Sequence, residues 1–310
     1  MELRCFSKAA VIIGTSFAPL YSSATSFELP IWKSEAEERG YVLPKAFGIS
    51  VGYMRVEQGI SVDSISFDGL KTPEITIPPI IPGRPPTVIP EQPIPAELIG
   101  IETSPGFQRS DVFTVRADMW LFPFLNFYAI AGKISGYSET NISVDIGGID
   151  FEPVQDERFL LDLDGNMYGG GLVLAGGYKE WFTIIDASYT KTNLTVIEGG
   201  IDSIVITPRL GYDFTNHGVP IRVWGGAQYQ NIQQTLKGKI SDLELPSALE
   251  GLLDFVNGDD EGRFIVEQSL ANEWNAVVGF NYVINPTFNI IGEFGFGDRQ
   301  SALISLDTRF

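Results

Sequence analysis

Long apolar runs, basic residues, histidine and cysteine are all scarce in this sequence of 310 residues. No stretch reaches the roughly 18 to 20 continuous apolar residues that a membrane-spanning helix needs, which excludes a helical membrane protein. The 39 Asp and Glu outnumber the 21 Lys and Arg, and the net charge of -18 excludes nucleic acid as a partner, because its phosphates would be repelled. An apolar fraction of 44% is too high for a disordered acidic chain.

The first 45 residues have the organisation of an export signal and a short spacer. Arg4 and Lys8 precede a mostly apolar run at 9–21, and small residues stand before Thr25, so residues 1–24 are predicted to be a cleaved signal peptide. Because the single cysteine, Cys5, lies within this signal, no disulfide is expected in the exported chain. We expect residues 25–45 to form a periplasmic segment, in which the capping box Ser34 to Glu37 predicts a short helix.

What the chain does have, from residue 46 to its end, is an alternation of apolar with polar or small residues. In residues 301–310, Ala302, Ile304, Leu306 and Phe310 alternate with polar residues such as Asp307. About ten segments repeat this period-two pattern of a strand with two different faces. The sequence therefore predicts an all-β fold for residues 46–310, an antiparallel up-and-down β-barrel of about ten strands. Eight or twelve strands are the alternatives, since 60–67 and 142–149 also alternate.

The links between these segments indicate that the barrel spans a membrane. Links such as 122–124, 179–180 and 285–286 are short and alternate with long ones at 58–107, 138–167 and 233–269. Bacterial outer-membrane barrels have short periplasmic turns and long extracellular loops. We therefore predict a transmembrane barrel with its apolar faces toward lipid and these three segments as extracellular loops.

The other face of the predicted strands carries charges of both signs, which we expect to line the lumen. Charges inside a narrow barrel must pair, because an unpaired buried charge costs several kcal/mol. The predicted lumen-lining residues are Arg116, Asp118, Asp186, Arg209, Asp213, Arg222, Glu273, Glu293, Asp307 and Arg309.

The last ten residues, with apolar side chains at every second position and Phe310 at the end, resemble the C-terminal assembly signal of Gram-negative outer-membrane β-barrel proteins. The resemblance implies localisation in the bacterial outer membrane and contact with its lipid. It also implies insertion by the barrel-assembly machinery, with Ile304, Leu306 and Phe310 as the recognised residues.

Three features of the long links bear on function. Nine prolines lie in residues 71–100, which favours an extended polyproline II conformation. Asp162, Asp164 and Asn166 have the oxygen spacing of a calcium loop, but Val173 stands where the bidentate Glu would be required, so no metal is expected. In the segment 233–269, a capping box at Ser247 predicts a short helix on the rim or inside the barrel.

We expect no enzyme activity and no cofactor. The only histidine, His217, lies in a predicted periplasmic turn, and Ser–His, Cys–His and His-rich metal sites therefore lack their members. The favoured hypothesis is a narrow or gated pore, or a structural barrel. The alternative is a surface-exposed binding or adhesion protein that acts through its acidic and proline-rich loops on an unknown extracellular ligand. A hydrolase at the rim is the least favoured.

Overall fold

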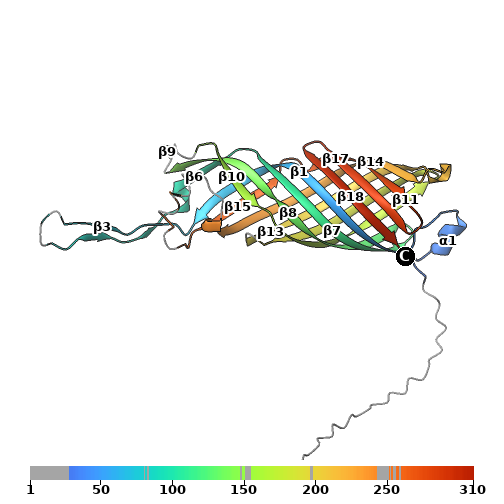
Figure 1. The fold of residues 1–310 in the computed structure, drawn as a ribbon, viewed down its shortest axis with the longest axis horizontal. Helices are drawn as coiled ribbons and strands as arrows, with labels where there is room; N and C mark the ends of the chain where they lie inside the picture. Colours follow the sequence, from blue (N-terminus) through green and yellow to red (C-terminus); the bar gives the residue numbers. More distant parts are fainter. Residues whose placement is uncertain are drawn as a thin grey trace, which may run out of the picture.

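The computed structural model describes residues 28–79, 81, 84–146, 149–150, 155–195, 198–242, 251, 253, 256–257 and 260–310. The predicted signal peptide, residues 1–24, lies outside these ranges. The described chain forms one long barrel, with the C-terminus and α1 (Lys33–Glu38) at one end and a narrow arm at the other (Figure 1). We call the half with the C-terminus the proximal half and the half that continues into the arm the distal half.

Ten antiparallel strands close the proximal half into a ring. Every neighbour is hydrogen-bonded to the next, and β1 closes the ring because it pairs with both β7 and β18. In ring order the strands are β1 (Phe47–Asp68), β7 (Gly106–Phe122), β8 (Leu125–Ile146), β11 (Gly165–Tyr178), β12 (Trp181–Leu194), β13 (Glu198–Asp213), β14 (Ile221–Lys239), β16 (Trp274–Val283), β17 (Phe288–Phe296) and β18 (Arg299–Arg309). The predicted all-β antiparallel barrel of about ten strands is confirmed.

Several strands run far beyond the ring. The hairpin of β17 and β18 turns at Gly297 and Asp298, and beyond it β1 pairs directly with β15 (Arg263–Leu270), from Ile60 opposite Leu270 onward. In the distal half β15 alone lies between β14 and β1, where β16, β17 and β18 lie in the proximal half. The barrel wall therefore has two strands fewer beyond this seam. Additional short elements lie in the distal half: β6 (Ile99–Thr103), β9 (Ile149–Asp150), β10 (Glu157–Asp162), η1 (Ala96–Leu98) and η3 (Ile240–Asp242).

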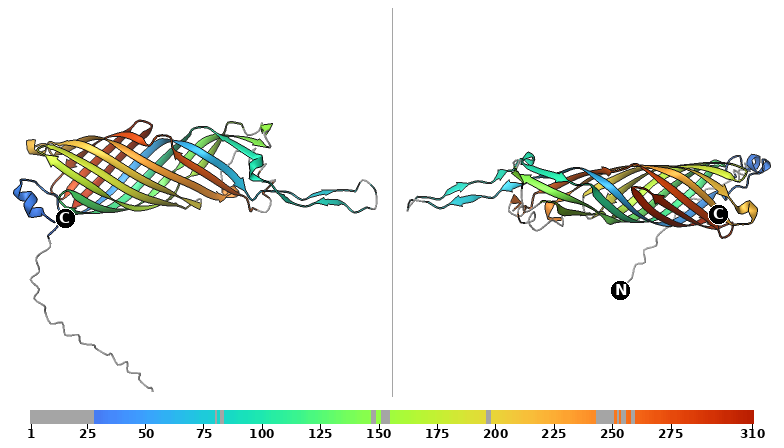
Figure 2. Two further views of the ribbon diagram at one scale, coloured as in Figure 1. Left: turned by 180° about the vertical axis from the view of Figure 1, so that it is seen from behind. Right: turned by 90° about the horizontal axis from the view of Figure 1, so that it is seen from above.

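The interpretation of 58–107, 138–167 and 233–269 as loops is wrong for much of their length. The continuations of β1, β8 and β14, together with β6, β10 and β15, are paired strands in these segments. The short turns do gather at one end, as predicted, because β7–β8, β11–β12 and β16–β17 all turn at the proximal end (Figure 2). The loops were overestimated because the distal strands carry their apolar residues on the opposite face.

β1 illustrates this change of face. In its proximal part Phe47, Ile49, Val51 and Tyr53 point outward, between 42% and 44% exposed, and Gly48 and Gly52 are buried. In its distal part the apolar residues point inward, and the polar residues between them face out. Because the register shifts between Val62 and Ser64, the next buried residue after Val62 is Ile65, three positions on instead of two. A β-bulge of this kind moves alternate side chains onto new positions without ending the strand.

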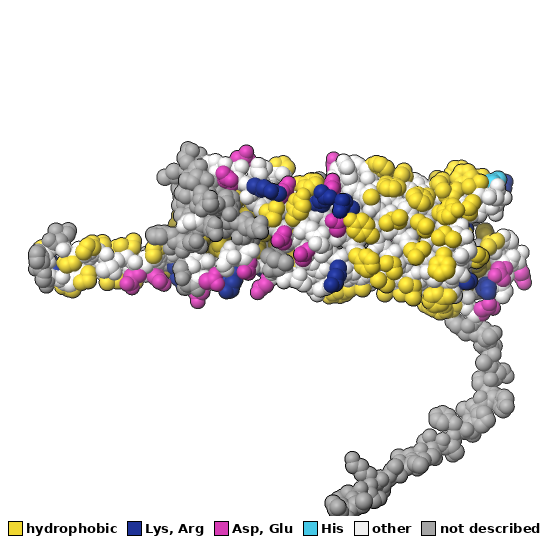
Figure 3. Space-filling view, viewed as in Figure 1, with side chains coloured by type: hydrophobic (Ala, Val, Ile, Leu, Met, Phe, Trp, Pro, Cys, Tyr) yellow, Lys and Arg dark blue, Asp and Glu magenta, His cyan; other side chains and the backbone are white. Residues whose placement is uncertain are grey.

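The outer surface follows this change. Hydrophobic side chains form a belt around the proximal half, whereas Lys, Arg, Asp and Glu side chains dot the outer wall of the distal half (Figure 3). The distal half therefore has the arrangement of a water-soluble barrel, with apolar residues inside and polar residues outside. Among the described residues, the belt expected from the sequence is found in the proximal half.

The apolar core of the molecule lies inside the distal half. Most of its residues come from β1, β8, β10, β14 and β15, and the ring of Phe264 is fully buried where Gly238 leaves room for it. Leu253, in the helical part of the segment predicted to form a short helix, is 2% exposed and joins this core. The core members are Ile60, Val62, Ile65, Phe67, Leu70, Ile142, Val144, Phe159, Leu161, Leu163, Leu236, Ile240, Leu253, Phe264 and Val266.

The proline-rich segment projects from the distal end as an arm (Figure 1). It contains two short pairs of strands, β2 (Lys71–Thr72) with β5 (Gln92–Pro93) and β3 (Ile75–Ile77) with β4 (Thr87–Ile89). Prolines stand next to or within all four of these strands, which limits the pairing of a third strand because proline lacks an N–H donor. The arm is thus a two-stranded ribbon instead of polyproline II throughout.

At the proximal end, the segment before β1 is docked on the barrel. The predicted helix is confirmed as α1, although it begins after Trp32 and Ser34 lies inside it without capping it. The Ile31 N–H donates to the carbonyl of Leu121 at 2.9 Å, and the ring of Trp32 lies 4.8 Å from that of Phe122. Within the described residues, no helix is both long enough and apolar enough to cross a membrane.

Candidate functional site

The lumen of the proximal half contains most of the predicted charged residues, and the first group is centred on Glu293. Arg209 of β13 donates to both carboxylate oxygens of Glu293 of β17, from Nε at 2.6 Å and Nη2 at 2.8 Å. The indole Nε1 of Trp224 also donates to Glu293, at 2.7 Å. Because β14 and β16 separate β13 from β17 in the ring, this bidentate pair crosses the interior.

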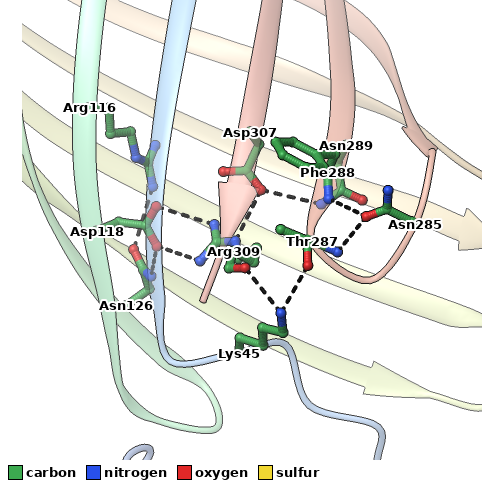
Figure 4. A network of polar contacts seen from close by, with 10 residues as sticks. All are labelled: Lys45, Arg116, Asp118, Asn126, Asn285, Thr287, Phe288, Asn289, Asp307 and Arg309. Carbon is green, nitrogen blue, oxygen red and sulfur yellow. Dashed lines mark hydrogen bonds and ion pairs between the residues drawn. The ribbon is translucent and has the colours of Figure 1, made fainter.

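A second group joins β7 to β18, the two strands on either side of β1 in the ring (Figure 4). Arg309 donates to Asp118 from Nη1 at 2.6 Å and Nη2 at 3.2 Å, and to Asp307 from Nε at 3.0 Å. Asn126 Nδ2 donates to the same Asp118 carboxylate at 2.6 Å. Gly48 of β1 lies beneath this network, and a Cβ there would meet Asp118 at 2.6 Å and Arg309 at 2.8 Å. A glycine is therefore required for the pair to reach across β1.

A third group surrounds Asp186 of β12. The hydroxyl of Tyr128 donates to its carboxylate at 2.7 Å, and Arg116 Nη1 lies 3.6 Å from the other oxygen. The guanidinium carbon of Arg116 lies 3.6 Å above the centre of the Tyr128 ring, a cation–π contact. These bonds join β7 and β8 to β12 through the lumen.

Two predicted lumen residues lie at the proximal mouth. Arg222 Nε donates to Asp213 at 2.7 Å, and the other oxygen of Asp213 accepts the backbone N–H of Thr215 at 2.8 Å. This pair fixes the turn between β13 and β14, which contains η2 (Thr215–His217). The ion pair of Arg222 with Asp213 therefore stabilises a turn, and its two side chains are only partly buried.

Glu273 does not point into the lumen, contrary to the prediction. Its carboxylate accepts hydrogen bonds from Asn231 at 2.8 Å and Tyr229 at 3.3 Å, on the outer face that Trp274 also occupies. Inward-facing residues are even-numbered in β15 and odd-numbered in β16, as the buried Gln268 and Asn275 show. The irregular backbone between these strands reverses the alternation and carries Glu273 outside.

Between the charged groups and the apolar core lies a layer of uncharged polar side chains, which we call the glutamine layer. Gln108 accepts from Gln58 at 3.4 Å and from Gln234 at 3.2 Å, and Ser138 donates to Gln268 at 3.2 Å. All five side chains are buried. They come from β1, β7, β8, β14 and β15. The bonds of Gln234 with Gln108 and of Ser138 with Gln268 span the lumen, whereas Gln58 and Gln108 are opposite each other on neighbouring strands.

Three kinds of side-chain contact lie inside the barrel: ion pairs in the proximal half, the glutamine layer, and the apolar core. Each arginine in the three charged groups has a carboxylate partner, which compensates the cost of enclosing it. Sequence reasoning missed Gln58, Gln108, Gln234, Asn126 and Tyr128, because it searched for charged residues and assigned position 58 onward to a loop. The large side chain of Trp224 falls among polar residues on its predicted strand. That position could have indicated a hydrogen-bond donor inside the lumen.

The three residues of the predicted assembly signal lie on the outer face of β18. Ile304, Leu306 and Phe310 are 57%, 47% and 59% exposed, and the backbone N–H of Phe310 donates to the carbonyl of Phe47 at 3.0 Å. Recognition of these residues by an assembly machinery remains a prediction.

His217 lies in η2 at the proximal end, with its Nε2 3.1 Å from the hydroxyl of Tyr212. Among the described residues, no group of three or more His, Cys, Asp or Glu side chains is arranged to hold a metal ion. Asp162, Asp164 and Asn166 lie at the junction of β10 with β11, where the carbonyl of Asp164 accepts the N–H of Thr195 at 2.9 Å.

No protein-family model matches the sequence, and no curated protein matches it. Solved structures that match include the Pseudomonas putida toluene transporter TodX, at 9% identity and a TM-score of 0.28, over 85% of this chain and 88% of that one. The Ralstonia pickettii toluene transporter TbuX matches at 12% and 0.30, over 86% and 90%. The transport unit of the Escherichia coli autotransporter AIDA-I matches at 10% and 0.22, over 86% and 90%. At these scores the likeness carries no argument, and the barrel assignment rests on the strand pairing of this chain.

Proposed function

We propose that this protein is an outer-membrane barrel whose lumen is closed and which acts as an anchor, presenting its arm to a partner outside the cell. The observation that carries the closed lumen is the apolar core of the distal half, where fifteen buried side chains occupy the interior. A conducting pore would require these side chains to leave, at a cost of roughly 1.5 to 3 kcal/mol for each one exposed to water.

The hydrophobic belt supports the membrane placement. β16 and β17, with ten and nine residues, have the length that a tilted strand needs to cross the hydrocarbon layer. At the distal edge of the belt, the hydroxyl of Tyr53 donates to Asp111, which also accepts from Arg55 Nε at 2.8 Å. An aromatic residue followed by an outward ion pair is expected where hydrocarbon gives way to water.

The arm supports the binding role. The apolar side chains of Ile75, Ile77 and Val88 are 48%, 43% and 49% exposed. Among the described residues, no part of the barrel covers them. In residues 71–95 two basic residues balance two acidic ones, in a chain of net charge -18. An isolated two-stranded ribbon is at best marginally stable in water, and an exposed apolar patch marks a site of interaction.

The closed lumen is tested by conductance in planar bilayers. We expect no discrete current steps from the intact protein once heat-modifiable migration on a gel has established that it is folded. Steps that change when Glu293 is replaced by Gln would instead support the narrow or gated pore, and would end the proposal of a closed anchor.

The binding role of the arm is tested with octyl-coated beads and cells that display the protein. Replacing Ile75, Ile77 and Ile89 together with Ser should lower cell retention on the order of tenfold, because three apolar side chains no longer dock. The variant Thr76→Ser with Thr87→Ser, in the same strands, is the matched control and should be retained like the intact protein. Equal retention of all three would rule out the arm as an apolar docking element.

A further inference from the structure

A shallow groove of about 290 Å³ lies on the outer wall at the seam where β17 and β18 turn. Its floor consists of the two small residues Ala227 and Ala276, and Trp274 and Phe296 stand exposed beside it. Trp274 is braced by Tyr229, whose ring lies 5.2 Å away. A floor of small side chains between two aromatic rings fits an alkyl chain.

The polar end of the groove is acidic. Asp298 lines it, and Asn272 Nδ2 donates to one of its carboxylate oxygens at 2.7 Å, which fixes the side chain at the turn. Glu273 lies on the same outer face beside Trp274, held by Asn231 at 2.8 Å. Among the described residues, neither carboxylate forms an ion pair with a basic side chain.

The nearest basic residue along the chain, Arg299, does not neutralise this end. It is 3% exposed and faces the lumen, where Nη1 donates to Gln228 at 3.0 Å and Nη2 donates to the carbonyl of Asn272 at 3.2 Å. The groove therefore presents the carboxylate of Asp298 and an indole ring to the outside, with the Glu273 carboxylate nearby on the same face. Carboxylates and aromatic faces together attract an ammonium group, through charge and cation–π contact.

The groove lies at the distal edge of the hydrophobic belt. Trp274 is the first residue of β16, and Asp298 lies beyond the last residue of β17. The apolar end of the groove therefore faces the belt and its acidic end faces away from it, as expected for a site that binds an amphiphile at a membrane surface. We propose that this groove binds an amphiphile with a primary-ammonium head. The alkyl chain lies over Ala227 and Ala276, and the ammonium group contacts Asp298 and the ring of Trp274.

The test uses the full chain in dodecyl maltoside micelles and measures quenching of tryptophan fluorescence by chain-brominated decylammonium. We expect saturable quenching that is lost in Trp274→Phe. Brominated decanol, which has the same chain without the charge, should bind about tenfold more weakly. The short 2-bromoethylammonium should bind weakly as well, which distinguishes an amphiphile from a free amine.

Variants separate the two ends of the groove. Asp298→Asn, which keeps an acceptor for Asn272, should weaken decylammonium about tenfold and leave brominated decanol unchanged. Ala276→Phe fills the floor and should weaken both. The control Glu102→Gln removes the same charge from an exposed strand position outside the groove and should change neither.

Equal quenching by the amine and the alcohol, or equal effects of Asp298→Asn and Glu102→Gln, would overturn the proposal. Heat-modifiable migration of each variant shows that it is folded. The measurement depends neither on the arm nor on conductance, so it can fail while the proposed anchor function stands.

Discussion

Replacement of Arg209 by Met will lower the free energy of unfolding by about 3 to 5 kcal/mol, because it leaves the Glu293 carboxylate buried without its bidentate partner. The side chains of the two residues are only 16% and 10% exposed, so water cannot easily take the place of the guanidinium. Among the described residues, Trp224 would remain as the hydrogen-bond donor to this carboxylate. Denaturant unfolding of the protein in micelles measures the change.

The double variant Arg209→Met with Glu293→Gln removes both charges and should recover most of the lost stability. Arg158→Met is the matched control on an exposed pair with Glu139, and it should cost less than about 1 kcal/mol. A single variant as stable as the parent, or a double variant no more stable than the single, would show that this pair does not hold the lumen together.

Replacement of Phe264 by Ala is expected to cost about 3 to 5 kcal/mol, because it removes a fully buried ring from the apolar core and leaves a cavity. Gly238 already faces this ring: a Cβ on Gly238 would lie 2.7 Å from it. Unfolding in denaturant, followed separately by fluorescence and by circular dichroism, measures the loss.

The matched control is Phe294→Ala on the outer face of β17, where the ring is 42% exposed. This variant opens no interior cavity and should cost clearly less than Phe264→Ala in the same micelles. A larger loss at Phe294 than at Phe264 would mean that the distal interior is not the packed core on which the closed lumen depends.

The proximal barrel could be predicted because its strands obey one rule throughout. In β18, for example, the apolar residues Ala302, Ile304 and Leu306 fall on even positions, and Asp307 and Arg309 fall on odd ones. Nine of the ten predicted lumen residues lie inside the barrel or at its mouth, where strand parity alone puts them. Their partners could not be predicted, since the bonds join strands that are not neighbours in the ring.

The distal half could not be predicted because alternation does not say which face meets water. Residues 60–67 show the pattern of a strand, but with the apolar side chains inside. Nothing in the sequence marks where the hydrocarbon layer ends, apart from charged residues such as Arg55 on the otherwise apolar face. Glu273 was misplaced for a related reason, because the break between β15 and β16 reverses parity and has no signature in composition.

The great length of β1 has a consequence for where a partner would meet this protein. Its 22 residues, at about 3.3 Å each and a tilt of about 40°, rise roughly 55 Å, and the hydrocarbon layer accounts for about 25 Å of that. The distal end of the barrel, where the arm begins, would then lie about 30 Å from the hydrocarbon layer. Inserting two residues into every distal strand, one facing inward and one outward, would move the start of the arm about 5 Å further from the lipid, and removing two would bring it about 5 Å closer.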